Sequence, residues 1–95
     1  MNIKDKHNIS LPISEISLFE SQVGITSSLF IMEGVYLENQ IIKVPALLVC
    51  VDGRLVYQDE NGKDEVLDSG DLINIKPMIK YSLRGLTNSQ TLIMK

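Results

Sequence analysis

RLVYQDENGKDEVLDSGDLINIKP, residues 54–77, is the stretch of the chain that decides its fold class. It holds two short runs in which apolar and polar residues alternate, 54–59 and 63–67, on either side of Asn61-Gly62. Alternation at every second residue is typical of a half-buried β-strand. Both central residues of a type I′ turn need a positive φ, which Asn-Gly accommodates, so we expect a hairpin closed by that turn.

The rest of the chain repeats short β-rich runs broken by Gly, Pro, Asn and Asp, which is the pattern of an all-β sandwich or barrel. No window keeps apolar residues at helical spacing, so we expect no helix. The most apolar run, 46–51, is continuous, and this predicts a strand buried on both faces. The segment 36–43 is irregular, with an extended piece only at 40–43. The remaining expected strands are 13–19, 25–32, 72–76, 81–83 and 91–95, with turns at 21–24 and 69–71 and a polar loop at 87–90.

The composition fits one small globular domain of 95 residues, of which 44% are apolar and 22% charged. We expect a polar, flexible tail over residues 1–10, without the apolar segment of a signal peptide, and a single domain over 11–95. No apolar run approaches the length that spans a bilayer, which argues against a membrane partner. A net charge of −3 with only two arginines argues against a nucleic-acid partner.

The single cysteine and the single histidine exclude several kinds of site. Cys50 has no partner for an intrachain disulfide, which is consistent with a reducing, cytoplasmic location. One His and one Cys cannot build a His/Cys zinc site, and His7 lies in the polar tail, far from any Ser-His-Asp pattern. Because Cys50 lies between Val49 and Val51 in the most apolar run, we expect an inert core thiol.

Two glycine-bounded segments carry a resemblance to a known family. Residues 70–83, beginning at Gly70, look like the second motif of the cupin family of small β-barrels, although Tyr81 stands where that motif has its His. In the same motif Lys76 takes the Pro position, Met78 the Gly and Gly85 the Asn. Gly34 and Gly53 fit the two ends of the first cupin motif, and residues 54–69 form a spacer of the length typical of compact microbial cupins. The resemblance covers about residues 25–95 and implies a cupin-like barrel, the double-stranded β-helix or jelly roll.

The resemblance fails at the four positions that hold the metal in the family. Three His and one Glu bind Fe, Mn, Zn or Ni there, whereas the matching residues of this chain are Gln40, Ile42, Ala46 and Tyr81. Ile42 and Ala46 have no donor atom, Gln40 is a weak neutral ligand, and a phenol has a pKa near 10. We therefore expect neither a catalytic metal nor any other cofactor, and the metal-dependent activities of the family do not carry over.

The same interior positions, with Leu83, are the predicted small-molecule site. Such a site would be apolar with two neutral polar groups, the side chains of Gln40 and Tyr81, which is a common kind of ligand pocket. A strongly anionic ligand is expected to fit poorly, because no cation is predicted inside. The alternative interpretation of Tyr81 is a core tyrosine whose hydroxyl finds a partner, and that of Gln40 is a hydrogen bond to backbone or water.

Three functions are compatible with these observations. The leading hypothesis is a metal-free, non-catalytic small cupin that binds a small molecule or a partner protein. We expect a homodimer, because the apolar residues exceed what one small barrel buries. A metal-independent isomerase or epimerase with Tyr81 as acid is the second hypothesis, and it needs a carboxylate such as Glu38 near Tyr81. A structural or interaction module with a filled barrel is the third.

Overall fold

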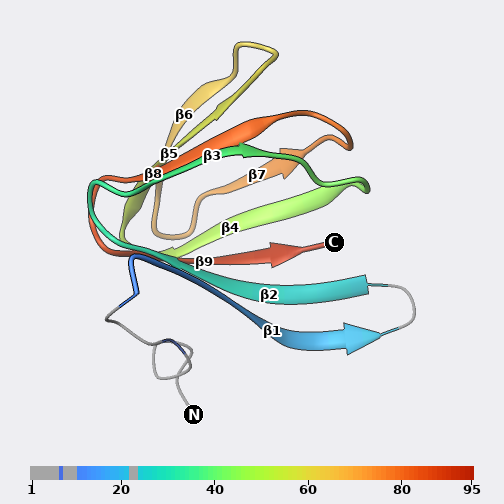
Figure 1. The fold of residues 1–95 in the computed structure, drawn as a ribbon, viewed down its shortest axis with the longest axis horizontal. Coiled ribbons are helices and arrows are strands. Elements are labelled where there is room, and N and C mark those ends of the chain that lie inside the picture. The colour runs from blue at the N-terminus through green and yellow to red at the C-terminus, as the bar shows by residue number, and fades with distance from the viewer. Residues whose placement is uncertain (1–6, 8–10, 22–23) are drawn as a thin grey trace.

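The computed structural model describes residue 7 and residues 11–21 and 24–95. All regular structure in this part of the chain is β-strand, which confirms the all-β expectation (Figure 1). No helix among the described residues could cross a membrane. The nine strands are β1 (Ile13–Ser21), β2 (Gly24–Ile31), β3 (Tyr36–Gln40), β4 (Ala46–Asp52), β5 (Arg54–Asp59), β6 (Asp64–Asp68), β7 (Leu72–Ile75), β8 (Tyr81–Gly85) and β9 (Ser89–Met94).

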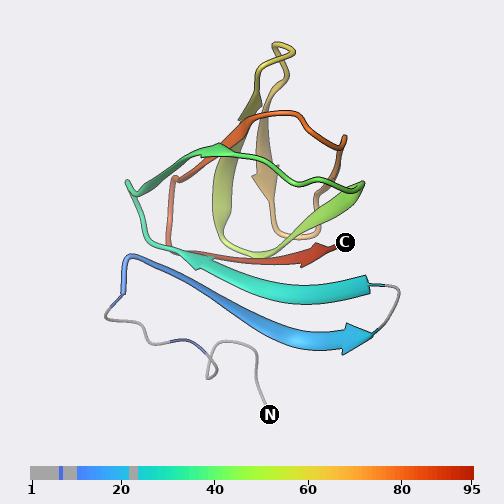
Figure 2. The same ribbon diagram turned by 45° about the vertical axis from the view of Figure 1, so that its right-hand side comes forward.

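The strands form two antiparallel sheets that face each other. One sheet has five strands in the order β1-β2-β9-β4-β7, and the other has four in the order β3-β8-β5-β6. Figure 2 shows the two sheets as the opposite walls of a barrel, with β1 outermost on one side. Neighbouring strands are distant in sequence at β2-β9 and β4-β9, so the fold closes only when the C-terminal strand is inserted.

The hydrophobic core lies between the two sheets. The strand register aligns Ile73, Leu48 and Ile93 on the inner face of the five-stranded sheet, and each is at most 3% exposed. Leu55 and Leu83 project from the other sheet and are fully buried. Burying one such side chain contributes about 1.5–3 kcal/mol, so this double layer holds the barrel together.

The expectation that residues 46–51 are buried on both faces is wrong. Burial alternates along β4: Ala46, Leu48 and Cys50 are buried, whereas Leu47 and Val49 are only half-buried. The reason is that β4 belongs to an antiparallel sheet with only one face on the core, and such a sheet presents its other face outward.

The expected hairpin is confirmed as β5-β6, but the turn type is not I′. Only Gly62 of the Asn-Gly pair has a positive φ, at 88°. The Gly62 N–H donates to the carbonyl of Asp59 at 3.1 Å, which closes a β-turn over residues 59–62 before the chain re-enters the ladder at Asp64. Asp59 holds this longer loop, because its Oδ1 accepts hydrogen bonds from the N–H groups of Asn61 and Lys63. The Asp59 carboxylate therefore overrides the preference of Asn-Gly for a type I′ turn.

Other boundaries also differ from the expectation. The strand in segment 36–43 is β3, whereas residues 41–43 are irregular, and Asn39 has a positive φ of 56° where the register of β3 and β8 shifts. Ser89 and Gln90, expected in a loop, are buried in β9. The Ser89 hydroxyl donates to the Arg54 carbonyl at 2.9 Å, so a polar residue is satisfied inside the fold.

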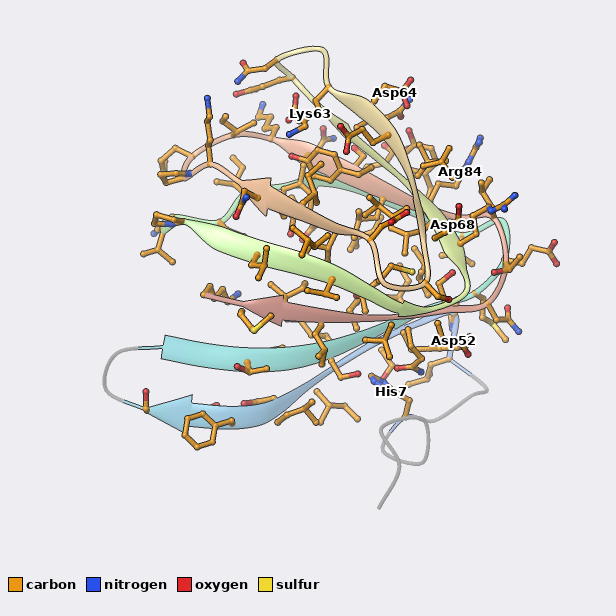
Figure 3. All side chains as sticks on the ribbon, turned by 180° about the vertical axis from the view of Figure 1, so that it is seen from behind. His7, Asp52, Lys63, Asp64, Asp68 and Arg84 are labelled. Carbon is orange, nitrogen blue, oxygen red and sulfur yellow. The ribbon has the colours of Figure 1, made fainter. Side chains whose placement is uncertain are left out.

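His7 is described by the structure and packs on the outer face of the five-stranded sheet. Its Nδ1 lies 2.9 Å from the hydroxyl of Ser14 and its Nε2 lies 2.7 Å from the hydroxyl of Ser28. The imidazole ring is 6.0 Å from that of Phe30. Figure 3 shows His7 on this side of the molecule, far from Lys63 on the hairpin. The rest of the expected tail, 1–6 and 8–10, and residues 22–23 of the expected turn lie outside the described residues.

We expect the stability of the protein to fall between pH 7.5 and 5.5. Burial lowers the pKa of His7 below its ordinary 6.5, so the unfolded chain binds the proton more tightly and unfolding is favoured as the pH drops through that range. Urea unfolding of the wild type should show this loss, and His7→Gln, which does not titrate, should show a smaller one. Equal losses in both proteins would contradict the assignment.

Candidate functional site

The structure brings four of the five predicted ligand residues together in the core. Ile42, Ala46, Tyr81 and Leu83 are all buried members of one hydrophobic cluster. Gln40 is half-buried and pairs with Tyr81 in the strand register, but its Nε2 donates to the carbonyl of Glu38 at 2.9 Å. That these residues contact a ligand stays a prediction.

Two stacked tyrosines occupy the middle of the barrel. The rings of Tyr57 and Tyr81 lie 5.8 Å apart at 20° to one another, and both residues are at most 5% exposed. The Tyr57 hydroxyl donates to Asp59 Oδ2 at 2.9 Å. No described residue forms a hydrogen bond with the Tyr81 hydroxyl, so of the two stacked phenols only that of Tyr57 is held by a described residue.

The buried surroundings of Tyr81 do not suit a general acid. Burial, with a smaller effect of the Glu15 carboxylate, raises the pKa of Tyr81 to about 12, whereas an efficient acid has a pKa near the working pH. Glu38, the example that the isomerase hypothesis gave for a carboxylate near Tyr81, is exposed, and the carboxylate that acts on Tyr81 is that of Glu15. Glu15 escaped the sequence analysis because it lies on β1, at the far edge of the other sheet.

The donor set does not fit a metal. Within residues 7, 11–21 and 24–95, no group of three or more His, Cys, Asp and Glu side chains is placed to hold an ion. The cupin ligand positions are filled by one amide, two aliphatic side chains and a phenol with a raised pKa. Divalent metals need deprotonated or imidazole donors, so the barrel interior offers no such site.

Cys50 has the surroundings of an inert thiol. It is fully buried and is not in a disulfide. Burial raises the pKa of the thiol, and the charges of Asp71, Asp52 and Asp68 raise it further. A thiolate nucleophile is therefore disfavoured here, as expected from the apolar sequence around Cys50.

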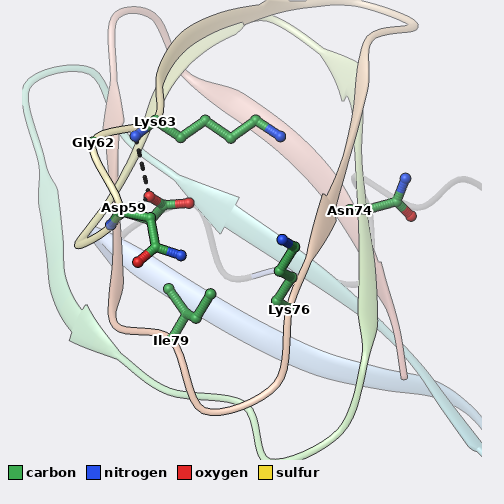
Figure 4. Close-up of a pocket in the computed structure, with 7 residues that line it drawn as sticks. Asp59, Gly62, Lys63, Asn74, Lys76 and Ile79 are labelled. Carbon is green, nitrogen blue, oxygen red and sulfur yellow. Dashed lines mark hydrogen bonds between the residues drawn. The ribbon is translucent and has the colours of Figure 1, made fainter.

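A cleft lies outside the barrel core, between the tip of the β5-β6 hairpin and the end of β7 (Figure 4). It encloses about 350 Å³. None of the five predicted ligand residues lines it, and the sequence analysis did not identify it. The lining residues are Asp59, Asn61, Gly62, Lys63, Asn74, Lys76 and Ile79.

The cleft combines two cations with a carboxylate that is already engaged. Asp59 accepts hydrogen bonds from the Tyr57 hydroxyl and from the N–H groups of Asn61 and Lys63, so both of its oxygens are occupied. Figure 4 shows the amines of Lys63 and Lys76 directed into the space between the hairpin and β7. No carboxylate of a described residue forms an ion pair with either lysine. The lining of the cleft therefore holds two ammonium groups and one carboxylate, which leaves one net positive charge.

We expect Tyr57→Phe to destabilise the protein by about 1–2 kcal/mol, because it removes a hydrogen bond from a buried phenol to a carboxylate. Tyr36→Phe is the matched control: it removes an exposed hydroxyl that donates to Gln58 at 2.8 Å, and surface changes of this kind stay within about 0.5 kcal/mol. Urea unfolding of the two variants checks the difference. Similar small losses in both would show that the Tyr57–Asp59 bond does not hold the hairpin.

The fold is that of cupins, as comparison with solved structures shows. A cupin superfamily protein from Desulfitobacterium hafniense aligns with a TM-score of 0.80 over 87% of this chain and 75% of its own, at 13% identity. An RmlC-like cupin from Shewanella frigidimarina aligns with a TM-score of 0.79 over 87% and 74%, also at 13% identity. The DMSP lyase DddQ from Ruegeria pomeroyi aligns with a TM-score of 0.81 over 87% of this chain and 46% of its own, at 13% identity.

No family model matches the sequence, and neither does any curated protein. Identities this low show a common fold and carry no activity to this chain. The predicted cupin-like barrel is therefore confirmed. The proteins that share this fold include a DMSP lyase as well as proteins described only by their fold. The cytoplasmic location stays a prediction.

Proposed function

We propose that this chain is a metal-free, non-catalytic small cupin that binds a small molecule in the cleft between the β5-β6 hairpin and β7. The observation that carries the proposal is the cleft itself, with Lys63 and Lys76 free of carboxylate partners among the described residues. Its volume of about 350 Å³ is at the lower end of known ligand pockets, which suits a ligand of metabolite size.

The absence of catalysis is supported by the chemistry of the available groups. A general acid or base needs a suitable pKa and hydrogen-bond reach to the reacting proton. Tyr81 is buried with a pKa of about 12, and Asp59 is engaged by three donors. The core residues act instead as a support, because Tyr57 links the stacked tyrosines to the aspartate that shapes the hairpin.

We also propose a homodimer formed through the outer face of the five-stranded sheet. The strand register places Phe19, Met94 and Leu47 in one row across that face. Phe19 is 66% exposed, and Leu72 on the same face is 55% exposed. Covering apolar side chains of this kind is a common gain from association.

Native mass spectrometry of the purified protein tests both proposals, with denaturing spectra recorded alongside. We expect the mass of a dimer, no metal, and a small molecule that is released on denaturation. Asn61→Trp fills the cleft from an exposed position at the tip of the hairpin and should abolish the extra mass. Val66→Trp adds the same bulk at an exposed position of β6 and should retain it.

Each contrary result rejects one part of the proposal. A stoichiometric transition metal would overturn the metal-free assignment. An extra mass that survives Asn61→Trp but disappears in Tyr81→Phe would move the ligand into the barrel, to the residues first predicted from the sequence. A clean apo-protein would favour a filled interaction module, and a monomer would reject the dimer.

A further inference from the structure

We propose that the ligand of this cleft is a small oxyanion, a metabolite whose carboxylate or phosphate group lies between Lys63 and Lys76. The inference rests on the proposed function and adds the chemical class of the ligand. A strongly anionic ligand was expected to fit the barrel interior poorly, because no cation is predicted there. The cleft lies outside that interior and is lined by Lys63 and Lys76, so the expectation does not extend to it.

The charges on the hairpin leave the two lysines available. Asp59 is the acidic residue of the lining, and its carboxylate is occupied by backbone and phenol donors. Asp64, on the other side of the tip, accepts a hydrogen bond from the amide of Gln58 at 3.4 Å. All these donors are neutral, so both carboxylates keep their negative charge, but neither forms an ion pair with Lys63 or Lys76. An incoming oxyanion is the missing partner, because it can accept charge-assisted hydrogen bonds from both amines.

The backbone on each side of the cleft is held in place. The N–H of Lys63 donates to Asp59 Oδ1 at 3.1 Å, and its carbonyl accepts the Asp59 N–H at 3.0 Å. On the opposite side, Lys76 directly follows β7 and precedes Pro77, whose ring restricts φ. The two lysines therefore need to order only their side chains when an anion binds, which lowers the entropic cost of binding.

The other lining residues of the cleft limit the size and polarity of the rest of the ligand, beyond its acidic group. Asn74 offers one amide donor and one acceptor, and Ile79 offers a small apolar contact. The cavity of about 350 Å³ is open to solvent between the hairpin and β7 (Figure 4). This combination suits a compact acid with a short carbon skeleton.

NMR titration of the ¹⁵N-labelled protein tests the proposal, with succinate and inorganic phosphate as probes. Succinamide, the neutral diamide of succinate, is the uncharged control. We expect amide shifts at residues 59–63 and 74–79 with at least one anion and none with succinamide. Lys63→Gln and Lys76→Gln should each weaken that binding about tenfold, as expected for the loss of one charge-assisted contact. Arg84→Gln, which removes a positive charge from an exposed position of β8 outside the cleft, should leave it unchanged.

The outcomes separate this inference from the proposed function. Succinate binding without phosphate binding assigns a carboxylate ligand, and the reverse assigns a phosphate. Equal shifts with succinamide, or binding that ignores both lysine variants, would overturn the anionic class. No shift with either anion up to 50 mM, roughly the weak limit of specific binding, would overturn it as well. The proposed function fails only if the native mass spectra show no ligand lost on filling the cleft.

Discussion

Gly53→Ala should destabilise the protein by about 3–5 kcal/mol, because backbone strain and a steric clash act together. Gly53 has a φ of 96°, which a residue with a Cβ rarely adopts. A methyl group there would also lie 2.5 Å from the carbonyl oxygen of Asn88 and 2.9 Å from the Cα of Ser89. The backbone must therefore move at the point where β4 passes into β5. The change in the urea midpoint measures the loss.

Gly70→Ala is the matched control for that prediction. Its φ is 92°, yet a methyl group would have no atom within 4 Å, so only the strain of about 1–2 kcal/mol remains. In the resemblance to cupins, Gly53 lies at the end of the first motif and Gly70 at the beginning of the second. If both variants lose the same stability, the close approach of residues 88 and 89 to Gly53 contributes nothing, and only its φ matters.

Tyr81→Ala should also destabilise the protein strongly, by about 3–5 kcal/mol, which is typical for removal of a buried aromatic ring. Tyr81 is 5% exposed and stacks on Tyr57, so the variant leaves a cavity beside a second ring. The resemblance to cupins would put a metal-binding His at this position, whereas here the side chain is expected to support the core. Chemical unfolding should be followed by circular dichroism and not by tryptophan fluorescence, because the chain contains no Trp.

Tyr81→Phe separates this packing role from a polar role. No described residue forms a hydrogen bond with the Tyr81 hydroxyl, so its removal should cost less than about 1 kcal/mol. The ligand mass seen in native spectra should persist in this variant. Loss of the ligand with stability unchanged would show that the phenol contacts a ligand inside the barrel, contrary to the role in core support.

These variants also test how the core is connected to the cleft. Tyr81 stacks on Tyr57, Tyr57 donates to Asp59, and Asp59 fixes the backbone of Lys63. Tyr57→Phe breaks this series in the middle. The interior of the barrel is thus connected through hydrogen bonds to the hairpin that forms one wall of the cleft.

Much of the fold could be predicted from local signals. The β5-β6 hairpin follows from alternation on either side of Asn61-Gly62. The inner face of β4 could not be predicted, because residues 46–51 are apolar throughout and only the pairing in the sheet shows which of them face the core. Asn39 and the turn at Gly62 could not be predicted in the same way. Their backbone conformations depend on a register shift against β8 and on acceptors supplied by Asp59, which are contacts made after the strands have paired.

The candidate site shows the same division. That no metal binds stays a prediction, but the unsuitable donor set at Gln40, Ile42, Ala46 and Tyr81 could be predicted, because it depends only on residue type. The cleft could not, because Lys63 and Lys76 are neighbours only once the hairpin lies beside the end of β7. The interaction between two charged groups depends on the distance between them in space, and sequence separation does not give the distance between two strands.

The amino-acid sequence by itself thus determined the all-β class, the order of turns and strands, and the residue types, unsuited to a metal, at positions 40, 42, 46 and 81. These depend on side-chain type and on spacing along one strand or turn. Only the tertiary structure decided which faces are covered, that His7 is buried against Ser14 and Ser28, and where two lysines meet beside an engaged carboxylate. The physical reason is that burial, pKa and unpaired charge arise from neighbours, and in this barrel most neighbours come from distant parts of the chain.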